Sequence, residues 1–187
     1  MNMKRLLIVC AVLILSGCAI SPQSLTVAPT LSFERLQGVT TPVELIIKDK
    51  RNNEKLLGYR NAKKQGEISF TDSVAKSLGE KIQAGLVYQG VNMATGEESA
   101  TRLEVQVYKL SYFTPDESWV STIEMNAEIL VAVDRGGASV KKRFKSNRKQ
   151  DVVTAPNKEF NEKFMNTLLS ELLNKALNDK EIVNFLK

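Results

Sequence analysis

The chain has 187 residues, 43% of them hydrophobic and 25% charged, which is typical of a soluble domain with a sizeable core. Its formal net charge is +5, and loss of Lys4 and Arg5 with an N-terminal signal leaves +3, too little to predict a nucleic-acid partner. There are two cysteines, Cys10 and Cys18, and no histidine. Cys10 falls inside the predicted signal, so the mature chain keeps only Cys18 and cannot form an internal disulfide. Without histidine, no recognisable motif supplies a base for nucleophilic catalysis.

Residues 1–17 are typical of a secretion signal. Lys4 and Arg5 precede an apolar run at residues 6–15, which as a helix would rise about 15 Å, roughly half the hydrocarbon thickness of a bilayer. A basic start and a short apolar run predict a secretory signal rather than a transmembrane anchor. The next residues, Leu15-Ser16-Gly17-Cys18, resemble the lipobox of bacterial lipoproteins. That resemblance implies cleavage between Gly17 and Cys18, a diacylglycerol on the Cys18 thiol, and fatty acids such as palmitate.

The residues after Cys18 predict how the protein is held. Two or more acyl chains anchor a protein stably, and Ala19, in place of an aspartate, implies the outer membrane by similarity to enterobacterial sorting. Residues 18–38, rich in serine, threonine and proline, are predicted to be the lipidated N-terminus and an extended tether. Residues 39–187 are predicted to form a periplasmic domain at the inner leaflet. Alternatively, Leu25, Val27, Leu31 and Phe33 of the tether lie along the domain surface.

The first half of the domain predicts two strands and a helix. Residues 43–48 alternate in polarity as a strand does, and residues 56–60 are a short second strand. Residues 71–89 predict a helix capped by Thr71 or Asp72, with an apolar residue at every fourth position from Val74 to Leu86 and Gly90 at its C-terminal end. Gly79 and Gly85 each weaken this helix by about 1 kcal/mol against alanine, and permit close packing on a sheet.

The second half predicts a three-stranded meander followed by two helices. The strands cover residues 103–113, with a bulge near Tyr108, residues 119–133 and residues 139–148, and Asp134-Arg135-Gly136-Gly137 closes the last hairpin. A wide apolar stripe at residues 160–173 predicts a long helix ending near residue 178, and residues 181–186 predict a short one. The order β-β-α-β-β-β-α-α predicts an α+β fold, an antiparallel sheet with helices packed on one face.

This layout resembles the YajG-type lipoproteins of gammaproteobacteria over nearly the whole chain. The resemblance implies an envelope location and an α+β fold, and only the lipobox carries known chemistry. The matching segments are the lipobox, Val27-Ala28-Pro29, residues 43–51, the helix from residue 71, the long strands and Glu181-Ile182-Val183-Asn184-Phe185-Leu186.

The most basic segment, residues 141–149, holds six basic residues in nine. Lys141, Arg143 and Lys145 share one face of a strand, and Val140 and Phe144 share the other. These cations either bind anionic lipid, lipopolysaccharide or peptidoglycan, or guard a sheet edge against aggregation or simply line a solvated face.

Three further candidates have structural explanations as well. We interpret Asp49 and Arg51 as a strand-end turn with a solvated ion pair, in preference to a polar binding site. Asp116 and Glu117 are better explained as exposed turn acids than as metal ligands. Packing in the core or on the sheet is favoured over the lining of a groove for four aromatic residues, Tyr108, Tyr112, Phe113 and Trp119.

The combined hypothesis is a non-enzymatic accessory or binding module of the cell envelope that docks on another envelope protein. The alternative is direct binding of an anionic envelope ligand through residues 141–149, and an envelope hydrolase is a third hypothesis without a supporting motif. We expect no metal, no nucleic acid, and no cofactor beyond the lipid on Cys18. A groove beside the basic strand would favour the ligand hypothesis, and a flat apolar patch would favour protein docking.

Overall fold

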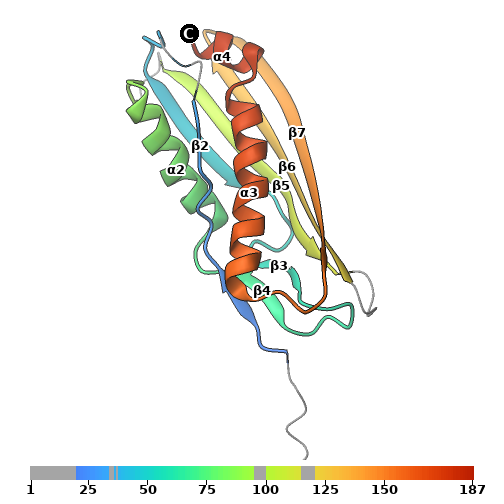
Figure 1. Ribbon diagram of the computed structural model, residues 1–187. Coiled ribbons are helices and arrows are strands. Elements are labelled where there is room, and N and C mark those ends of the chain that lie inside the picture. Colours follow the sequence, from blue (N-terminus) through green and yellow to red (C-terminus); the bar gives the residue numbers. More distant parts are fainter. Residues whose placement is uncertain (1–19, 34–35, 37, 95–99, 115–120) are drawn as a thin grey trace, which may run out of the picture.

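The computed structural model describes residues 20–33, 36, 38–94, 100–114 and 121–187 (Figure 1). Gly17 and Cys18 of the lipobox, the acids Asp116 and Glu117, and Trp119 lie outside the described residues. The described elements are β1 Gln23–Leu25, β2 Val43–Asp49, β3 Leu56–Tyr59, β4 Glu67–Phe70, α2 Val74–Tyr88, β5 Thr101–Phe113, β6 Ser121–Arg135, β7 Ala138–Val152, α3 Lys158–Leu177 and α4 Lys180–Leu186.

Seven strands form one open sheet, and the three described helices lie on one of its faces (Figure 1). The strand order is β1-β4-β3-β5-β6-β7, with β2 paired to the first half of β5. The predicted α+β class with helices on one face is confirmed, but the sheet is mixed rather than purely antiparallel. Strand β2 runs parallel to β5, because the intervening α2 returns the chain to the same end of the sheet.

The predicted meander is confirmed as β5, β6 and β7, which pair antiparallel. The register between β5 and β6 shifts between Val107 and Lys109, which confirms the bulge at Tyr108. At the β6–β7 turn, Gly136 and Gly137 have φ of 55° and 84°, the left-handed geometry of a two-residue hairpin loop. Alternate residues of β5 and β6 are buried under the helices, among them Val105, Ile129 and Val131.

Helices α2 and α3 bury the predicted apolar stripes. Ser73, rather than Thr71 or Asp72, caps α2 by accepting a hydrogen bond from Lys76 N, and Gly90 follows the helix with φ of 80°. Asn157 caps α3, and Asp179 caps α4. The central leucines of α3 are fully buried, whereas Phe160 is partly exposed.

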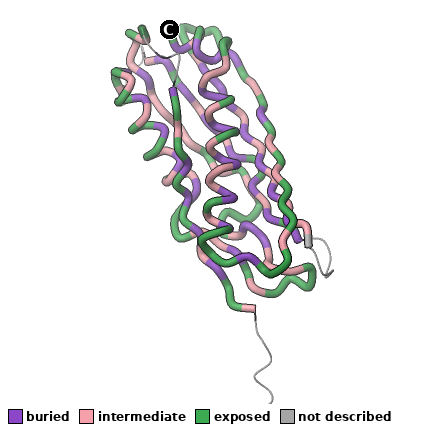
Figure 2. Tube along the Cα trace, in the orientation of Figure 1, coloured by how far each residue is buried: buried purple, intermediate pink, exposed green. Residues whose placement is uncertain are grey.

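The largest difference from the sequence-based prediction concerns the N-terminal segment, residues 20–33. It runs along the domain between α2 and α3 (Figure 1), and its exposure alternates residue by residue (Figure 2). Leu25, Val27 and Phe33 are buried in the core, and β1 pairs parallel with β4. The packed domain therefore contains residues assigned above to a tether and begins before residue 39. The alternative is closer to the structure, because the segment does lie along the domain, but Leu25, Val27 and Phe33 are buried in the core rather than placed on its surface.

Candidate functional site

Helix α3 holds the N-terminal segment through polar side chains spaced four residues apart. Glu162 Oε1, Asn166 Oδ1, Ser170 Oγ and Asn174 Oδ1 accept hydrogen bonds from the backbone N–H groups of Thr26, Ala28, Thr30 and Ser32, at 2.7, 2.7, 2.8 and 2.8 Å. In return, the side-chain amides of Asn166, Asn174 and Asn178 donate to the carbonyls of Thr26, Thr30 and Ser32, at 3.0, 3.2 and 2.7 Å. We call this set of bonds the polar ladder.

The polar ladder works because two different repeats have nearly the same length. Four residues of α-helix rise about 6.0 Å, and two residues of extended chain rise about 6.6 Å. Each even-numbered residue of the segment therefore meets the next polar side chain of α3. The odd-numbered side chains point into the core between α2 and the sheet, as the burial of Leu25, Val27 and Phe33 shows.

The other edge of the segment is unpaired over its central part. Backbone N–H groups alternate in direction along an extended chain, so those of Val27 and Leu31 point away from α3 and toward α2. Within the described part of the chain, neither has a hydrogen-bond partner. Pro29 lies between them and has no N–H to satisfy. The segment, which continues as extended chain beyond β1, therefore presents a short unpaired backbone edge to α2.

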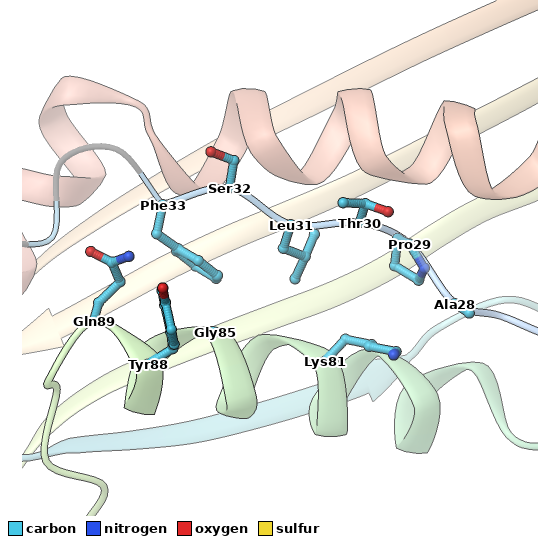
Figure 3. Close-up of a pocket in the computed structure, with 10 residues that line it drawn as sticks. All are labelled: Ala28, Pro29, Thr30, Leu31, Ser32, Phe33, Lys81, Gly85, Tyr88 and Gln89. Carbon is cyan, nitrogen blue, oxygen red and sulfur yellow. The ribbon is translucent and has the colours of Figure 1, made fainter.

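A groove of about 500 Å³ lies between this free edge and α2 (Figure 3). One wall is residues 28–33, and the other is formed by Lys81, Gly85, Tyr88 and Gln89. Tyr88 is 87% exposed, and in Figure 3 it extends toward Phe33 across the groove. The Phe33 ring packs so closely on Gly85 that a Cβ there would lie 1.9 Å from Phe33 Cε2. The groove has the size of many ligand sites.

The groove lining brings together few reactive groups. Lys81 is its one charged side chain, and none of the hydrogen bonds among the described residues joins it to the hydroxyls of Thr30 or Ser32. No three histidine, cysteine, aspartate or glutamate side chains of the described residues gather as metal ligands would.

The basic segment lies on β7, at one edge of the sheet and away from this groove. As predicted from the alternation, Lys141, Arg143 and Lys145 are exposed, while Val140 and Phe144 are buried. Arg143 forms an ion pair with Glu128, and Lys145 Nζ lies 3.1 Å from the same carboxylate. These hydrogen bonds hold the pKa of Glu128 below its usual value. Of the three, Lys141 alone forms no ion pair with another described residue.

The glutamates of β6 therefore neutralise much of the positive charge on β7 that the sequence suggested as a binding surface for an anionic ligand. Lys149 Nζ likewise lies 3.3 Å from Glu124. A shallow hollow of about 370 Å³ does lie beside Lys145, but Glu128 is part of its lining. The guanidinium of Arg143 also covers the Tyr108 ring at 4.6 Å. On this face of the sheet, most of the basic side chains are therefore held in ion pairs with acidic side chains of the neighbouring strand.

The remaining candidates do not converge on a site. Asp49 and Arg51 do form an ion pair, at 2.6 Å, but both side chains are almost fully buried rather than solvated. Arg51 also donates to the carbonyl of Glu54 at 2.6 Å and lies over the Phe70 ring, so the pair fixes the β2–β3 connection. Tyr112 faces the core, where burial raises its pKa to about 12.

The groove is not predictable from a motif, because neither of its walls contains a conspicuous one. A usable signal did exist in the polar positions of α3: Glu162, Asn166, Ser170, Asn174 and Asn178 recur every four residues. Alone, that pattern describes a solvated helix face. Read beside the alternate apolar residues of the segment, it predicts an extended chain laid along α3.

Residues 34–187 match the model of a protein family described as uncharacterized lipoprotein. The chain belongs to this lipoprotein family. The match confirms the resemblance to YajG-type lipoproteins. A search of curated protein sequences finds no significant match. Among the described residues, no helix combines the length and the apolar character needed to cross a membrane.

Several solved structures are distantly similar to the chain, all at low sequence identity. Protein XCC0632 from Xanthomonas campestris is 8% identical, with a TM-score of 0.47 over 88% of this chain and 93% of that one. The rare lipoprotein B from Shewanella oneidensis is 15% identical, with a TM-score of 0.37 over 72% and 87%. Lipoprotein GNA1162 from Neisseria meningitidis is 12% identical, with a TM-score of 0.34 over 74% and 99%. Similarities this distant carry no functional argument.

Proposed function

We propose that this protein is a non-enzymatic accessory lipoprotein of the outer membrane, which binds an extended segment of another envelope protein in the groove beside α2. Family membership supports an envelope lipoprotein. The lipobox supports a diacylglycerol and palmitate on Cys18, and Ala19 supports the inner leaflet of the outer membrane, with the domain facing the periplasm.

The unpaired backbone edge of residues 28–33, along one wall of the groove, carries the binding proposal. An extended peptide can pair with an unpaired strand edge through main-chain hydrogen bonds, and pockets for its side chains then give specificity. Here Leu31 N–H is the available donor, and α2 runs alongside as the second wall. The exposed ring of Tyr88 offers an apolar contact, and Lys81 favours a segment that carries an acidic residue.

Peptide binding can be tested with an array of overlapping peptides from envelope proteins, probed with the domain from residue 20 onward. Peptides that bind in the groove should lose about tenfold in affinity, about 1.4 kcal/mol, with Lys81→Glu or Tyr88→Ala. Val87→Ala is the matched control, because Val87 is 54% exposed on α2 but does not line the groove. Equal loss with all three variants, or no selective peptide, would contradict the proposal.

Amide exchange gives a second readout of an extended, strand-like partner. In the free domain, Ala28 and Thr30 N–H groups should exchange slowly because the polar ladder holds them, whereas Leu31 N–H should exchange fast. A bound peptide should slow the Leu31 amide specifically. Binding that leaves Leu31 unprotected would show that the peptide does not pair with this edge.

Anchoring is tested separately with Cys18→Ser in the full-length chain. We expect this variant to accumulate as an uncleaved, mislocalised precursor without incorporated palmitate, because the thiol that accepts the lipid is missing. Normal processing and normal recovery with outer membranes would refute the lipobox assignment. Either result leaves the groove test unaffected, since that test uses the unlipidated domain.

A further inference from the structure

The start of the described chain is fixed to one end of the domain. Ile20 packs on the β3–β4 loop so closely that a Cβ on Gly66 would lie 2.5 Å from Ile20 Cγ2. Arg60 donates hydrogen bonds to the carbonyl of Ser21 at 3.0 Å and to that of Pro156 at 3.2 Å. These contacts join the entering chain to two loops, residues 60–66 and 152–156, which we call the anchor end.

The length of chain before Ile20 determines how far this end can lie from the lipid. Cys18 is two residues upstream, and two extended residues span at most about 7 Å. Because residues 20–33 are packed on the domain, they add no slack. A lipid on Cys18 therefore keeps the anchor end within about one headgroup layer of the bilayer surface.

The exposed side chains of the anchor end suit such a surface. The loop of residues 60–66 carries the exposed cations Lys63 and Lys64 and no acidic residue, with Glu67 at its border. Val153 is 80% exposed in the neighbouring loop, and Phe160 is partly exposed beside it. Apolar side chains next to cations are the combination that adsorbs to anionic headgroups, and such a second contact strengthens a lipid anchor.

We propose that the anchor end rests on the headgroups of the membrane that carries the Cys18 lipid, so that the domain stands upright rather than swinging on a tether. The proposal rests on lipid attachment at Cys18 and does not depend on what binds in the groove. The far end of the domain, at the β6–β7 turn, then points away from the membrane. Residues 139 and 153 are separated by roughly 45 Å, since a strand rises about 3.3 Å per residue.

The test uses full-length lipidated protein in phosphatidylethanolamine–phosphatidylglycerol vesicles that contain a lipid with a nitroxide on its headgroup. Because Cys18 would be the only cysteine of the mature chain and carries the lipid, one introduced cysteine takes a thiol-reactive fluorophore at a single position. Val153→Cys reports on the anchor end. Ser139→Cys is the control, because it is exposed at the opposite end of the same strand β7.

We expect quenching at Val153 to exceed that at Ser139 several-fold. Lys63→Glu with Lys64→Glu should reduce the quenching at Val153 by about half, as the contact with anionic lipid weakens. Equal quenching at the two positions would overturn the proposal, and so would quenching at Val153 that both charge reversals leave unchanged. Protein that does not float with the vesicles would overturn it together with the lipid assignment.

Discussion

Replacing Gly85 with alanine should destabilise the domain, whereas the same change at Gly79 in the same helix should stabilise it. Both glycines are interior to α2, where alanine is favoured over glycine by about 1 kcal/mol. Their surroundings differ. A Cβ on Gly79 would lie 3.4 Å from Ile47 Cγ1, an ordinary contact, whereas on Gly85 it would lie 1.9 Å from Phe33 Cε2.

The clash at Gly85 determines the sign of its effect. Carbon atoms pack at about 3.5–4.0 Å, so the buried Phe33 ring must move by about 1.5 Å or more. Overpacking of this kind costs about 1–3 kcal/mol, and a displaced ring also loses part of its burial. After the gain in helix propensity is subtracted, Gly85→Ala should lower the free energy of unfolding by about 1–2 kcal/mol. Gly79→Ala should raise it by about 0.5–1 kcal/mol.

Urea denaturation of the domain from residue 20 onward measures both changes as shifts of the midpoint at constant slope. The cause is isolated by repeating Gly85→Ala in a Phe33→Ala background. There the obstructing ring is gone, so the same substitution should become stabilising. If the two alanine variants shift the midpoint in the same direction, or if Phe33→Ala leaves the effect of Gly85→Ala unchanged, the packing of the N-terminal segment on α2 is wrong.

Three further outcomes are expected. A domain that begins at Val39 should have a free energy of unfolding several kcal/mol lower than one that begins at residue 20, because it lacks the buried side chains of the segment. Its urea midpoint should therefore be lower. Glutamine at Lys141, Arg143 and Lys145 together should leave co-sedimentation with anionic vesicles unchanged and increase self-association in light scattering, because the cations guard the edge of β7; salt-sensitive sedimentation that the variant abolishes would instead support ligand binding. Partial burial of Asp179 opposes its ionisation, but hydrogen bonds from Lys142 and from the backbone N–H groups of residues 181 and 182 lower its pKa overall. Stability from this group is therefore present above about pH 4 and lost as the pH falls further, and Asp179→Asn should reduce that acid-dependent loss in melting curves.

Local patterns in the sequence were enough to predict the elements that depend on near neighbours. The hairpin at Gly136 and Gly137 follows from two residues that adopt positive φ readily, and the bulge at Tyr108 follows from a change in the phase of the apolar alternation. The apolar stripe of α3 is likewise set within the helix itself. Each of these features needs only residues that are close in the chain.

The parts that were missed depend on contacts distant in the chain. Strands β1 and β4 contain three and four residues, too few for a periodic pattern, and they form because they pair with each other across more than 40 residues of sequence. The buried Asp49–Arg51 pair has the same composition as a solvated turn, and its burial, which includes the contact between Arg51 and the Phe70 ring, depends on residues farther along the chain. Serine, threonine and proline made residues 18–38 resemble a tether, because composition does not reveal that α3 satisfies the backbone.

The packed N-terminal segment links the lipid to the groove in a way that a flexible tether would not. An extended chain rises about 3.3 Å per residue, so the groove wall at residues 28–33 begins roughly 26 Å beyond Ile20. With the anchor end on the headgroups, that distance becomes a height above the membrane.

The same segment whose even-numbered amides bind α3 offers the odd-numbered Leu31 amide to a partner. Loosening the polar ladder, for example with Asn166→Ala, should therefore weaken peptide binding in the groove even though Asn166 does not line it. Thr167→Ala is the matched control, because its hydroxyl bonds only within α3, to the carbonyl of Lys163. Equal peptide affinity in the two variants would show that the segment holds its shape without the ladder.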